Sequence, residues 1–352
     1  MTDNKKLTVL YFGSYDPNYS RNRVLISGLR QNGVEVIECR SSLKGLYKFF
    51  DLFLKHRKLK LNYDLIIVGF LGQQIVPFAK LITSKPIIFD AFLSLYDSNV
   101  LDRKTTKPFS LKSCYYWFLD WLSMSLADAV LFDTYEHISY AAKEFRIKKN
   151  KFRRIFVGTD EKLFCPREGN DNPVFAAHFH GSFIPLQGID CIIRAAKLLE
   201  NEKIKFNILG SGQTYSQIKR LSSDLGIRSI DFINWVEYAK LPEYISQSDV
   251  CLGIFGETIK AKRVIPNKIY EYAAMRKPII TSDTPAIREL FNEGDMLLIK
   301  PNPEDLASAI LKLKNNPELG KSLAGNAYKK IKMFATPEIL GRELRQIAEG
   351  LL

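Results

Sequence analysis

The sequence predicts an α/β protein with two doubly wound, Rossmann-like domains. Apolar runs of strand length alternate with longer stretches of helical periodicity, which is the pattern of parallel sheets covered by helices. With 352 residues, the chain is long for a single hydrophobic core. The alternation is interrupted once, by a polar segment with glycines and prolines, and then restarts. Two consecutive domains of this class account for all three observations.

The interruption sets the expected domain boundaries. The predicted N-terminal domain covers residues 1–160 and the C-terminal domain covers residues 173–335, with a linker over 161–172. The linker region has glycines and prolines and no apolar periodicity, as expected for a segment that few contacts cross.

The N-terminal half opens with a strand, a glycine loop, a helix and a second strand, the start of a doubly wound sheet. Continuous apolar runs predict buried strands, and apolar spacings of three and four predict helices. The expected strands are 7–12, 34–37, 64–69, 85–89 and 128–132, and the expected helices are 21–32, 42–61, 108–127 and 134–145.

The C-terminal half repeats the alternation and ends in helices. The expected strands are 174–179, 206–209, 230–235, 250–254, 279–281 and 296–299. The expected helices are 190–199, 214–225, 241–247, 266–275, 302–313, 317–333 and 337–351.

The composition is that of a soluble globular protein, with 46% hydrophobic and 25% charged residues. No apolar run reaches the roughly 18–20 residues of a bilayer-spanning helix, and the first residues lack the apolar core of a signal peptide. The five cysteines are scattered and form no CxxC pair, which favours reduced thiols over a zinc site. We therefore expect a cytoplasmic protein without a metal centre.

The net charge of +13 lies mainly in the N-terminal half, where residues 1–160 hold 25 Lys+Arg against 15 Asp+Glu. This excess suits a nucleic acid, an anionic membrane or a phosphorylated substrate, and equally an ordinary basic surface. The predicted helix 42–61 is basic and carries an apolar side formed by Leu46, Phe49, Phe50, Phe53 and Leu54. Such a helix either lies on an anionic membrane or packs on the core with its basic face in solvent.

Two residues at strand ends of the N-terminal half are candidates for ligand contact. In open α/β sheets, ligands bind beyond the carboxyl ends of the strands. Gly13 follows the first strand, where a glycine lets a ligand approach the backbone closely. Asp90 follows strand 85–89 and places a carboxylate at the same edge. The alternative role for Asp90 is a helix N-cap.

The stretch 266–275, PNKIYEYAAM, carries the strongest single signal. Pro266 favours a helix start, and the first backbone N–H groups, at Asn267 and Lys268, have no partner within the helix. Together with the helix dipole these groups favour a phosphate. Glu271 lies about one turn further on, where a carboxylate can accept hydrogen bonds from a ribose diol. The pattern indicates a nucleotide-diphosphate site, although Pro and Glu are also ordinary helix-start residues.

Four segments together resemble one family. A glycine loop opens the second domain, VGTDEKLFCP stands at the join, LGSGQ follows a middle strand, and PNKIYEYAAMRKPIITSD comes late. This combination resembles the GT-B glycosyltransferases of the family 4 retaining type, over essentially the whole chain. The resemblance implies two Rossmann-like domains that face a central cleft, with the nucleotide sugar mainly on the C-terminal domain and the acceptor mainly on the other. It also implies that the last helix, about 336–352, crosses back to the N-terminal domain.

The resemblance assigns donor-binding roles to the glycine loops and to helix 266–275. Beside the diphosphate it places Gly181, Ser182 and Phe183, and near the nucleoside Gly210 and Gly212. Against the phosphates it places Pro266, Asn267 and Lys268, and against the ribose Glu271. The expected base pocket consists of Asn234, Trp235 and Val236.

Two positions depart from the family pattern. Members usually carry two glutamates separated by seven residues, but the position eight before Glu271 is Arg263, and the nearby Glu257 is out of register. A lysine usually precedes the glycine of the first loop, and here that residue is Gln187. The candidates to supply the missing positive charge are Lys260, Lys262 and Arg263.

The implied reaction moves a sugar, with retention of configuration, from a UDP- or GDP-sugar to a hydroxyl of a glycan or lipid-linked acceptor, as in cell-surface polysaccharide synthesis. Positive side chains and helix N–H groups would stabilise the departing diphosphate. The candidate catalytic residues are Asp90, Lys260, Lys268 and Glu271. No metal or other cofactor is expected, because no metal-ligand cluster or DxD pair stands in a suitable place.

The basic, aromatic-rich N-terminal half suits an anionic membrane acceptor, so the inner face of a membrane is the alternative location. Two other classes remain open. A sugar-nucleotide epimerase shares the two-domain architecture but needs no acceptor. A non-catalytic nucleic-acid-binding protein would suit the charge, but basic and aromatic residues are not interleaved in a recognisable RNA-binding motif. We therefore expect no nucleic-acid partner.

Overall fold

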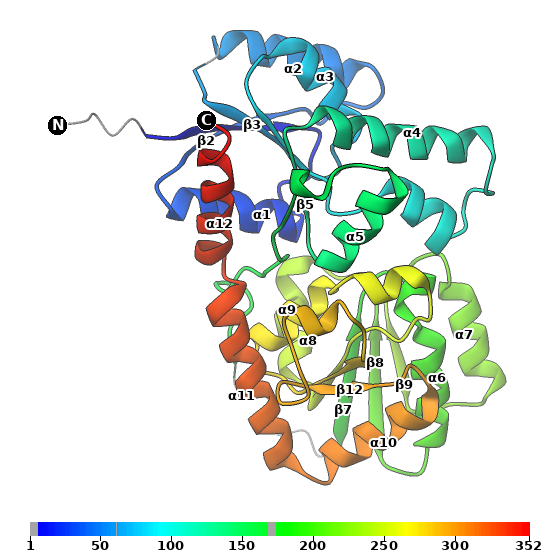
Figure 1. Cartoon of the computed structure of the whole chain (residues 1–352). Coiled ribbons are helices and arrows are strands. Elements are labelled where there is room, and N and C mark those ends of the chain that lie inside the picture. The colour runs from blue at the N-terminus through cyan, green and yellow to red at the C-terminus, as the bar shows by residue number, and fades with distance from the viewer. Residues whose placement is uncertain (1–5, 61, 168–173) are drawn as a thin grey trace. The chain divides into compact units, whose positions relative to one another are not determined.

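The computed structural model describes residues 6–60, 62–167 and 174–352. Its contacts divide the chain into two units: unit 1 comprises Met1–Asp160 and Phe334–Leu352, and unit 2 comprises Glu161–Met333 (Figure 1). The end of the predicted linker, residues 168–172, lies outside the described residues.

Unit 1 is built on a six-stranded parallel sheet with the order β2-β1-β3-β4-β5-β6. Its strands are β1 (Thr8–Gly13), β2 (Glu35–Arg40), β3 (Leu65–Val68), β4 (Ile87–Asp90), β5 (Ala129–Phe132) and β6 (Phe152–Arg154). Its helices are α1 (Ser20–Gln31), α2 (Tyr47–Lys58), α3 (Ile75–Ile82), α4 (Leu111–Leu126), α5 (Tyr135–Glu144) and α12 (Pro337–Glu349), with a π-helical turn at Asp97–Asp102. The strand order changes direction between β1 and β3, and ligands bind beyond the strand ends at such a switch point.

Unit 2 holds a second six-stranded parallel sheet, with the order β12-β11-β10-β7-β8-β9. Its strands are β7 (Phe175–His180), β8 (Ile204–Leu209), β9 (Ile230–Ile233), β10 (Val250–Leu252), β11 (Ile279–Ser282) and β12 (Leu297–Ile299). Its helices are α6 (Ile189–Leu198), α7 (Tyr215–Asp224), α8 (Leu241–Ser246), α9 (Asn267–Ala274), α10 (Pro303–Lys314) and α11 (Pro317–Phe334). The switch point here lies between β7 and β10. Two doubly wound parallel sheets confirm the predicted fold class.

Most element boundaries differ from the expected ones by one or two residues, but neither α3 nor β6 was predicted. The sequence of α3, IVPFAKLI, has eight residues and is apolar almost throughout, so it is too short for periodicity alone to distinguish a helix from a buried strand. Pro77 falls in its first turn, where its missing N–H would have no partner in any case. The predicted helix 42–61 is shorter in the structure, because α2 begins only at Tyr47.

The C-terminal helix α12 packs on α1 within unit 1. Two glycines meet where these helices cross. A Cβ on Gly28 would lie 2.1 Å from the carbonyl oxygen of Pro337, and a Cβ on Gly341 would lie 2.0 Å from the carbonyl carbon of Gly28. A side chain at either position would push the two backbones apart, so this sequence specifies an unusually close crossing of the first and last helices of unit 1.

Candidate functional site

Two glycine loops lie side by side at the carboxyl end of the unit 2 sheet. Strands β7 and β8 pair in parallel along their whole length, so the loops that follow them leave the sheet together. The N–H of Gly181 donates to the Leu209 carbonyl (3.0 Å), and that of Phe183 donates to the Ser211 carbonyl (2.8 Å). A Cβ on Gly210 would lie only 2.0 Å from the Gly181 oxygen. Glycine is therefore required for the backbones of these loops to touch.

The other predicted loop residues contribute in different ways. Gly212 has a φ of +148° and faces the Phe183 backbone, where an added Cβ would lie 2.8 Å from the Phe183 nitrogen. The Phe183 ring is fully buried and packs edge-on against Tyr215. Phe183 thus contributes its backbone to the loop while its side chain packs in the core. Ser182, by contrast, is exposed.

Helix α9 brings a buried lysine to the first glycine loop. Pro266 is the N-cap and makes no side-chain hydrogen bond to the helix. The Lys268 Nζ donates to the Gln187 side chain and lies 3.6 Å from the centre of the Phe179 ring. A Cβ on Gly181 would lie 3.0 Å from this nitrogen. The Lys268 side chain therefore lies at the loop in which Gln187 replaces the family lysine.

Burial lowers the pKa of Lys268 well below its usual value, although the Glu271 carboxylate opposes this shift. An ammonium removed from water loses its hydration, and a nearby anion restores the balance in favour of the charged form. A phosphate group bound beside the glycine loop would supply such an anion.

Glu271 is held by two side chains that the sequence did not single out. Tyr238 donates to Glu271 Oε1 (2.8 Å), and His180 Nε2 lies 2.8 Å from Oε2. His180 Nδ1 in turn lies 3.1 Å from His178 Nε2, and burial lowers the pKa of His178 well below its usual value. Glu271 itself is only 2% exposed. Alternate residues of a strand share a face, so the His-x-His at the end of β7 was the available sequence signal.

The three basic candidates precede α9 in a 3₁₀ segment, Ile259–Arg263. Lys260 and Arg263 are buried, whereas Lys262 is exposed and its carbonyl accepts a hydrogen bond from Ala286 N–H. Their proposed role as replacements for the family lysine stays a prediction.

The expected base pocket lies just beyond β9. Trp235 is 72% exposed, Val236 is half-buried, and the Asn234 side chain accepts a hydrogen bond from the Tyr215 hydroxyl (3.4 Å). An exposed indole is available to stack on a flat ring. The contact of these residues with a base stays a prediction.

In unit 1, the structure does not support the predicted role of Asp90. Its side chain and that of Arg21 are both 0% exposed, and Arg21 Nη2 lies 2.7 Å from Asp90 Oδ1. Arg21 Nε also donates to both carboxylate oxygens, at 2.7 and 2.9 Å. The guanidinium covers the carboxylate, so Asp90 forms a buried ion pair instead of facing an acceptor or sugar hydroxyl. Gly13 does lie at the end of β1 as expected, with a φ of +139°.

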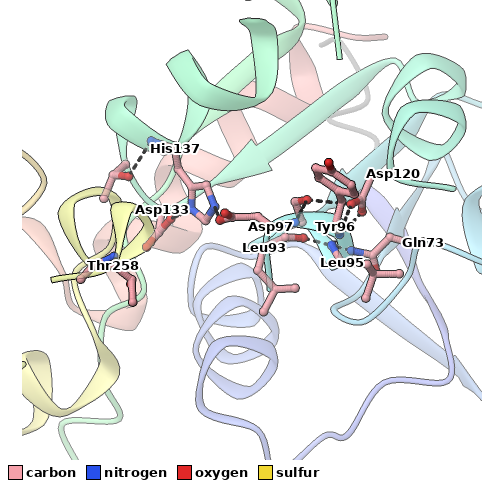
Figure 2. A network of polar contacts seen from close by, with 12 residues as sticks. Gln73, Leu93, Leu95, Tyr96, Asp97, Asp120, Asp133, His137 and Thr258 are labelled. Atoms are coloured by element: carbon pink, nitrogen blue, oxygen red, sulfur yellow. Dashed lines mark hydrogen bonds and ion pairs between the residues drawn. The ribbon is translucent and has the colours of Figure 1, made fainter. Parts of the chain in front are cut away.

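Unit 1 also contains a buried network of carboxylates that sequence reasoning missed (Figure 2). His137 Nδ1 lies 3.0 Å from Asp133 Oδ1, and its Nε2 lies 4.0 Å from Asp97 Oδ2. Nearby, Asp120 from α4 organises the loop after β4, as Figure 2 shows. Its carboxylate accepts hydrogen bonds from the Ser94 hydroxyl (2.7 Å) and from the backbone N–H groups of Leu95 (3.1 Å) and Tyr96 (2.9 Å).

Asp120 should make stability depend on pH. Burial raises its pKa to about 6, and the hydrogen bonds from Tyr96, Ser94 and Leu95 oppose the shift. A carboxyl whose pKa is raised in the folded state stabilises that state most at low pH, and this contribution is lost as the pH rises. We expect wild type to lose about 2 kcal/mol of stability relative to Asp120→Asn between about pH 4 and pH 6. Denaturant unfolding across this range measures the difference, and parallel profiles would contradict it.

Among the residues that the structure describes, no three His, Cys, Asp or Glu side chains are grouped so that they could hold a metal ion. Within the same residues, no helix has the length and apolar character needed to cross a membrane.

The glycine loops, α9 and the basic 3₁₀ segment all fall within one recognised sequence region. Residues 175–316 match the model of the family described as Glycosyl transferases group 1. The chain carries a glycosyltransferase group 1 domain. This domain lies inside unit 2 and includes Gly181, Gly210, Lys268 and Glu271.

Two curated proteins that match part of this chain carry glycosyltransferase or sugar-transferase names. The chain is 25% identical over 196 residues to the uncharacterized glycosyltransferase MJ1178 of Methanocaldococcus jannaschii, a match that covers 53% of this chain and 50% of that protein. It is 24% identical over 170 residues to the alpha-D-kanosaminyltransferase of Streptomyces kanamyceticus, covering 45% of this chain and 40% of that protein. The matches thus span half or less of the relatives' own lengths.

Solved structures match the chain over both units. The Anabaena protein Alr3699/HepE in complex with UDP and glucose has a TM-score of 0.72 at 15% identity, covering 98% of this chain and 100% of that chain. The sucrose-phosphate synthase tll1590 from Thermosynechococcus elongatus has a TM-score of 0.77 at 16% identity, covering 99% of each chain. At this identity the similarity establishes the fold, which is GT-B.

Proposed function

We propose that this protein is a retaining glycosyltransferase that moves a sugar from a nucleoside-diphosphate sugar to a hydroxyl of a glycan or lipid-linked acceptor. In this proposal the donor binds unit 2, and a product is a cell-surface polysaccharide or its precursor. UDP and glucose in the Alr3699/HepE structure make a UDP-sugar the first donor to test.

The observation that carries the proposal is the position of Lys268. Lys268 lies in the first turn of α9, and its buried side chain reaches the Gly181 loop at the carboxyl edge of a doubly wound sheet. Helix N-termini and glycine loops present backbone N–H groups to anions, and such loops sit where open α/β sheets bind nucleotides. A phosphate bound at the same point would favour the protonated form of Lys268, which then adds a full positive charge.

In the proposed reaction, the bond between the sugar and the diphosphate breaks, and negative charge develops on the departing phosphate. Lys268 and the N-terminal N–H groups of α9 stabilise that charge, and a preorganised donor of this kind typically contributes about 3–4 kcal/mol. Glu271 fixes the nucleotide through its ribose. We further propose that no metal ion is required, which full activity in the presence of a chelator would support.

A ligand-binding experiment tests the donor site without knowledge of the acceptor. Thermal shift with UDP, GDP, ADP and their sugars should raise the melting temperature of wild type, because a ligand that binds only the native state stabilises it by RT ln(1 + [L]/Kd). Lys268→Met should remove most of the shift, since it removes the charge at the loop.

Lys312→Met, at an exposed position on α10, is the matched control and should keep the shift. An unchanged shift in Lys268→Met would remove the assignment. Conversion of a sugar nucleotide without any acceptor would instead identify an epimerase.

A further inference from the structure

Helix α2 has two apolar faces. The inner face packs on the core of unit 1, and the outer face is exposed. Phe49, Leu52 and Leu59 pack against the core of unit 1. On the outside, Leu46 is 82% exposed and Phe50 is 66% exposed. A surface helix normally buries its single apolar stripe and turns polar residues to solvent. The sequence grouped Phe49 with the outer residues, and the structure separates them.

Helix α4 also exposes apolar side chains, and two hydrogen bonds through Gln74 connect it to α2. The Lys48 Nζ donates to Gln74 Oε1 (2.6 Å), and Gln74 Nε2 donates to the Tyr115 hydroxyl (3.0 Å), so the start of α3 links the two helices. Figure 1 shows α2, α3 and α4 in unit 1. We call the exposed set the outer apolar face: Leu46, Tyr47, Phe50 and Leu54 of α2, with Leu111 and Phe118 of α4. Leu46, Tyr47, Phe50 and Leu54 follow one another within about two turns of α2, and such clusters of exposed apolar side chains usually mark an interaction site.

A cationic cavity adjoins this face. It has a volume of about 460 Å³ and lies beyond the carboxyl ends of β1 and β2, next to the switch point of the unit 1 sheet. Arg40, Lys44 and Lys48 contribute positive charge to its wall, and Asp16 contributes one negative charge. The hydroxyl-bearing Ser14 and Ser42 also line it. Guanidinium, ammonium and hydroxyl groups together form the usual recognition set for phosphate.

The cavity and the outer apolar face are formed by neighbouring residues of the sequence. Leu43 lines the cavity and is 50% exposed, and α2 begins four residues later. Burial lowers the pKa of Lys48, and a phosphate in the cavity would oppose that shift. A ligand with a phosphate at one end and a hydrocarbon chain at the other would match both surfaces at once.

We propose that the cavity and the outer apolar face bind a phosphate-bearing membrane lipid, with the phosphate beside Arg40, Lys44 and Lys48 and the hydrocarbon against α2. This inference rests on the proposed function and narrows it, because it makes the acceptor a lipid-linked phosphate in the plane of a bilayer. Basic residues flanking an apolar helix face are complementary to an anionic lipid surface. A soluble sugar phosphate would use the cavity but would leave the apolar face without a role.

Vesicle flotation tests the lipid site directly. The full-length protein is mixed with phosphatidylcholine vesicles that contain or lack phosphatidic acid. Three variants are compared: Arg40→Gln/Lys44→Gln/Lys48→Gln, Phe50→Ser/Leu54→Ser, and the control Lys143→Gln/Lys148→Gln/Lys149→Gln. The control removes the same charge from exposed positions elsewhere in unit 1. A lysine near an anionic surface contributes about 1 kcal/mol, so we expect the cavity variant to bind roughly a hundredfold more weakly than the control.

We expect wild type to bind vesicles only when they contain phosphatidic acid, and inorganic phosphate should not abolish this binding. The cavity and apolar-face variants should lose the binding, whereas the control should keep it. Equal binding by the cavity and control variants, binding to phosphatidylcholine alone, or full competition by inorganic phosphate would overturn the proposal. The nucleotide thermal shift is measured on the same proteins. A normal shift with no vesicle binding rejects the lipid site alone, whereas vesicle binding without any nucleotide shift rejects the transferase assignment.

Discussion

Replacing Glu271 by Gln is expected to raise the Kd for the donor nucleotide about a hundredfold and to lower kcat/KM to a similar extent. A carboxylate offers about four lone-pair positions, so Glu271 can accept hydrogen bonds from a diol while Tyr238 and His180 hold it in place. A hydrogen bond to a charged group contributes about 1.5–3 kcal/mol, and a ribose diol makes two. Titration calorimetry with the nucleotide that most stabilises wild type measures the loss.

Deoxy analogues make this test specific for the ribose. Wild type should bind the 2′- or 3′-deoxy nucleotide more weakly than the parent, whereas Glu271→Gln should barely distinguish the two, as in a double-mutant cycle. Glu243→Gln, at an exposed position on α8, is the control. An equal deoxy penalty in wild type and Glu271→Gln would show that another group contacts the diol.

Much of the proposed donor region was predictable because its local structure depends on short-range rules. Glycine favours the tight loops that follow buried strands, and proline favours the first turn of a helix. The placement of Gly181 and Gly210 at strand ends and of Pro266 at a helix start therefore followed from the sequence alone. The carboxyl ends of parallel strands converge at one edge, so the sheet then brings these local features together. The two-domain fold followed from the same alternation.

The missed features depend on contacts between distant residues. Nothing near Glu271 in the sequence indicates that Tyr238 and His180 would hold it, because they come from two other segments. The same holds for Lys268, whose side chain reaches Gln187 at a sequence separation of 81. Hydrophobic periodicity also cannot tell the inner from the outer apolar face of α2, since both follow the same helical spacing.

Breaking the buried pair between Arg21 and Asp90 should cost unit 1 much of its stability. Asp90→Asn leaves a guanidinium without its counter-ion at a position with 0% exposure, and such a change typically costs about 3–5 kcal/mol. Burial raises the pKa of Asp90 and the Arg21 charge offsets part of that shift, so the carboxylate depends on Arg21 just as Arg21 depends on it. Denaturant unfolding should show the loss, while the nucleotide thermal shift of the folded protein should persist because it reports on unit 2.

The double variant Arg21→Met/Asp90→Leu separates a structural role from a catalytic one. Replacing both members of a buried ion pair by apolar groups is often neutral or stabilising, so the double variant should be more stable than Asp90→Asn alone. The Arg21 Nη1 also donates to the Ile155 carbonyl (3.1 Å), and the loss of this bond limits the recovery. If Asp90→Asn instead kept wild-type stability and lost only transfer, Asp90 would return as a residue that contacts substrate, and the pair with Arg21 would have to open when the acceptor binds.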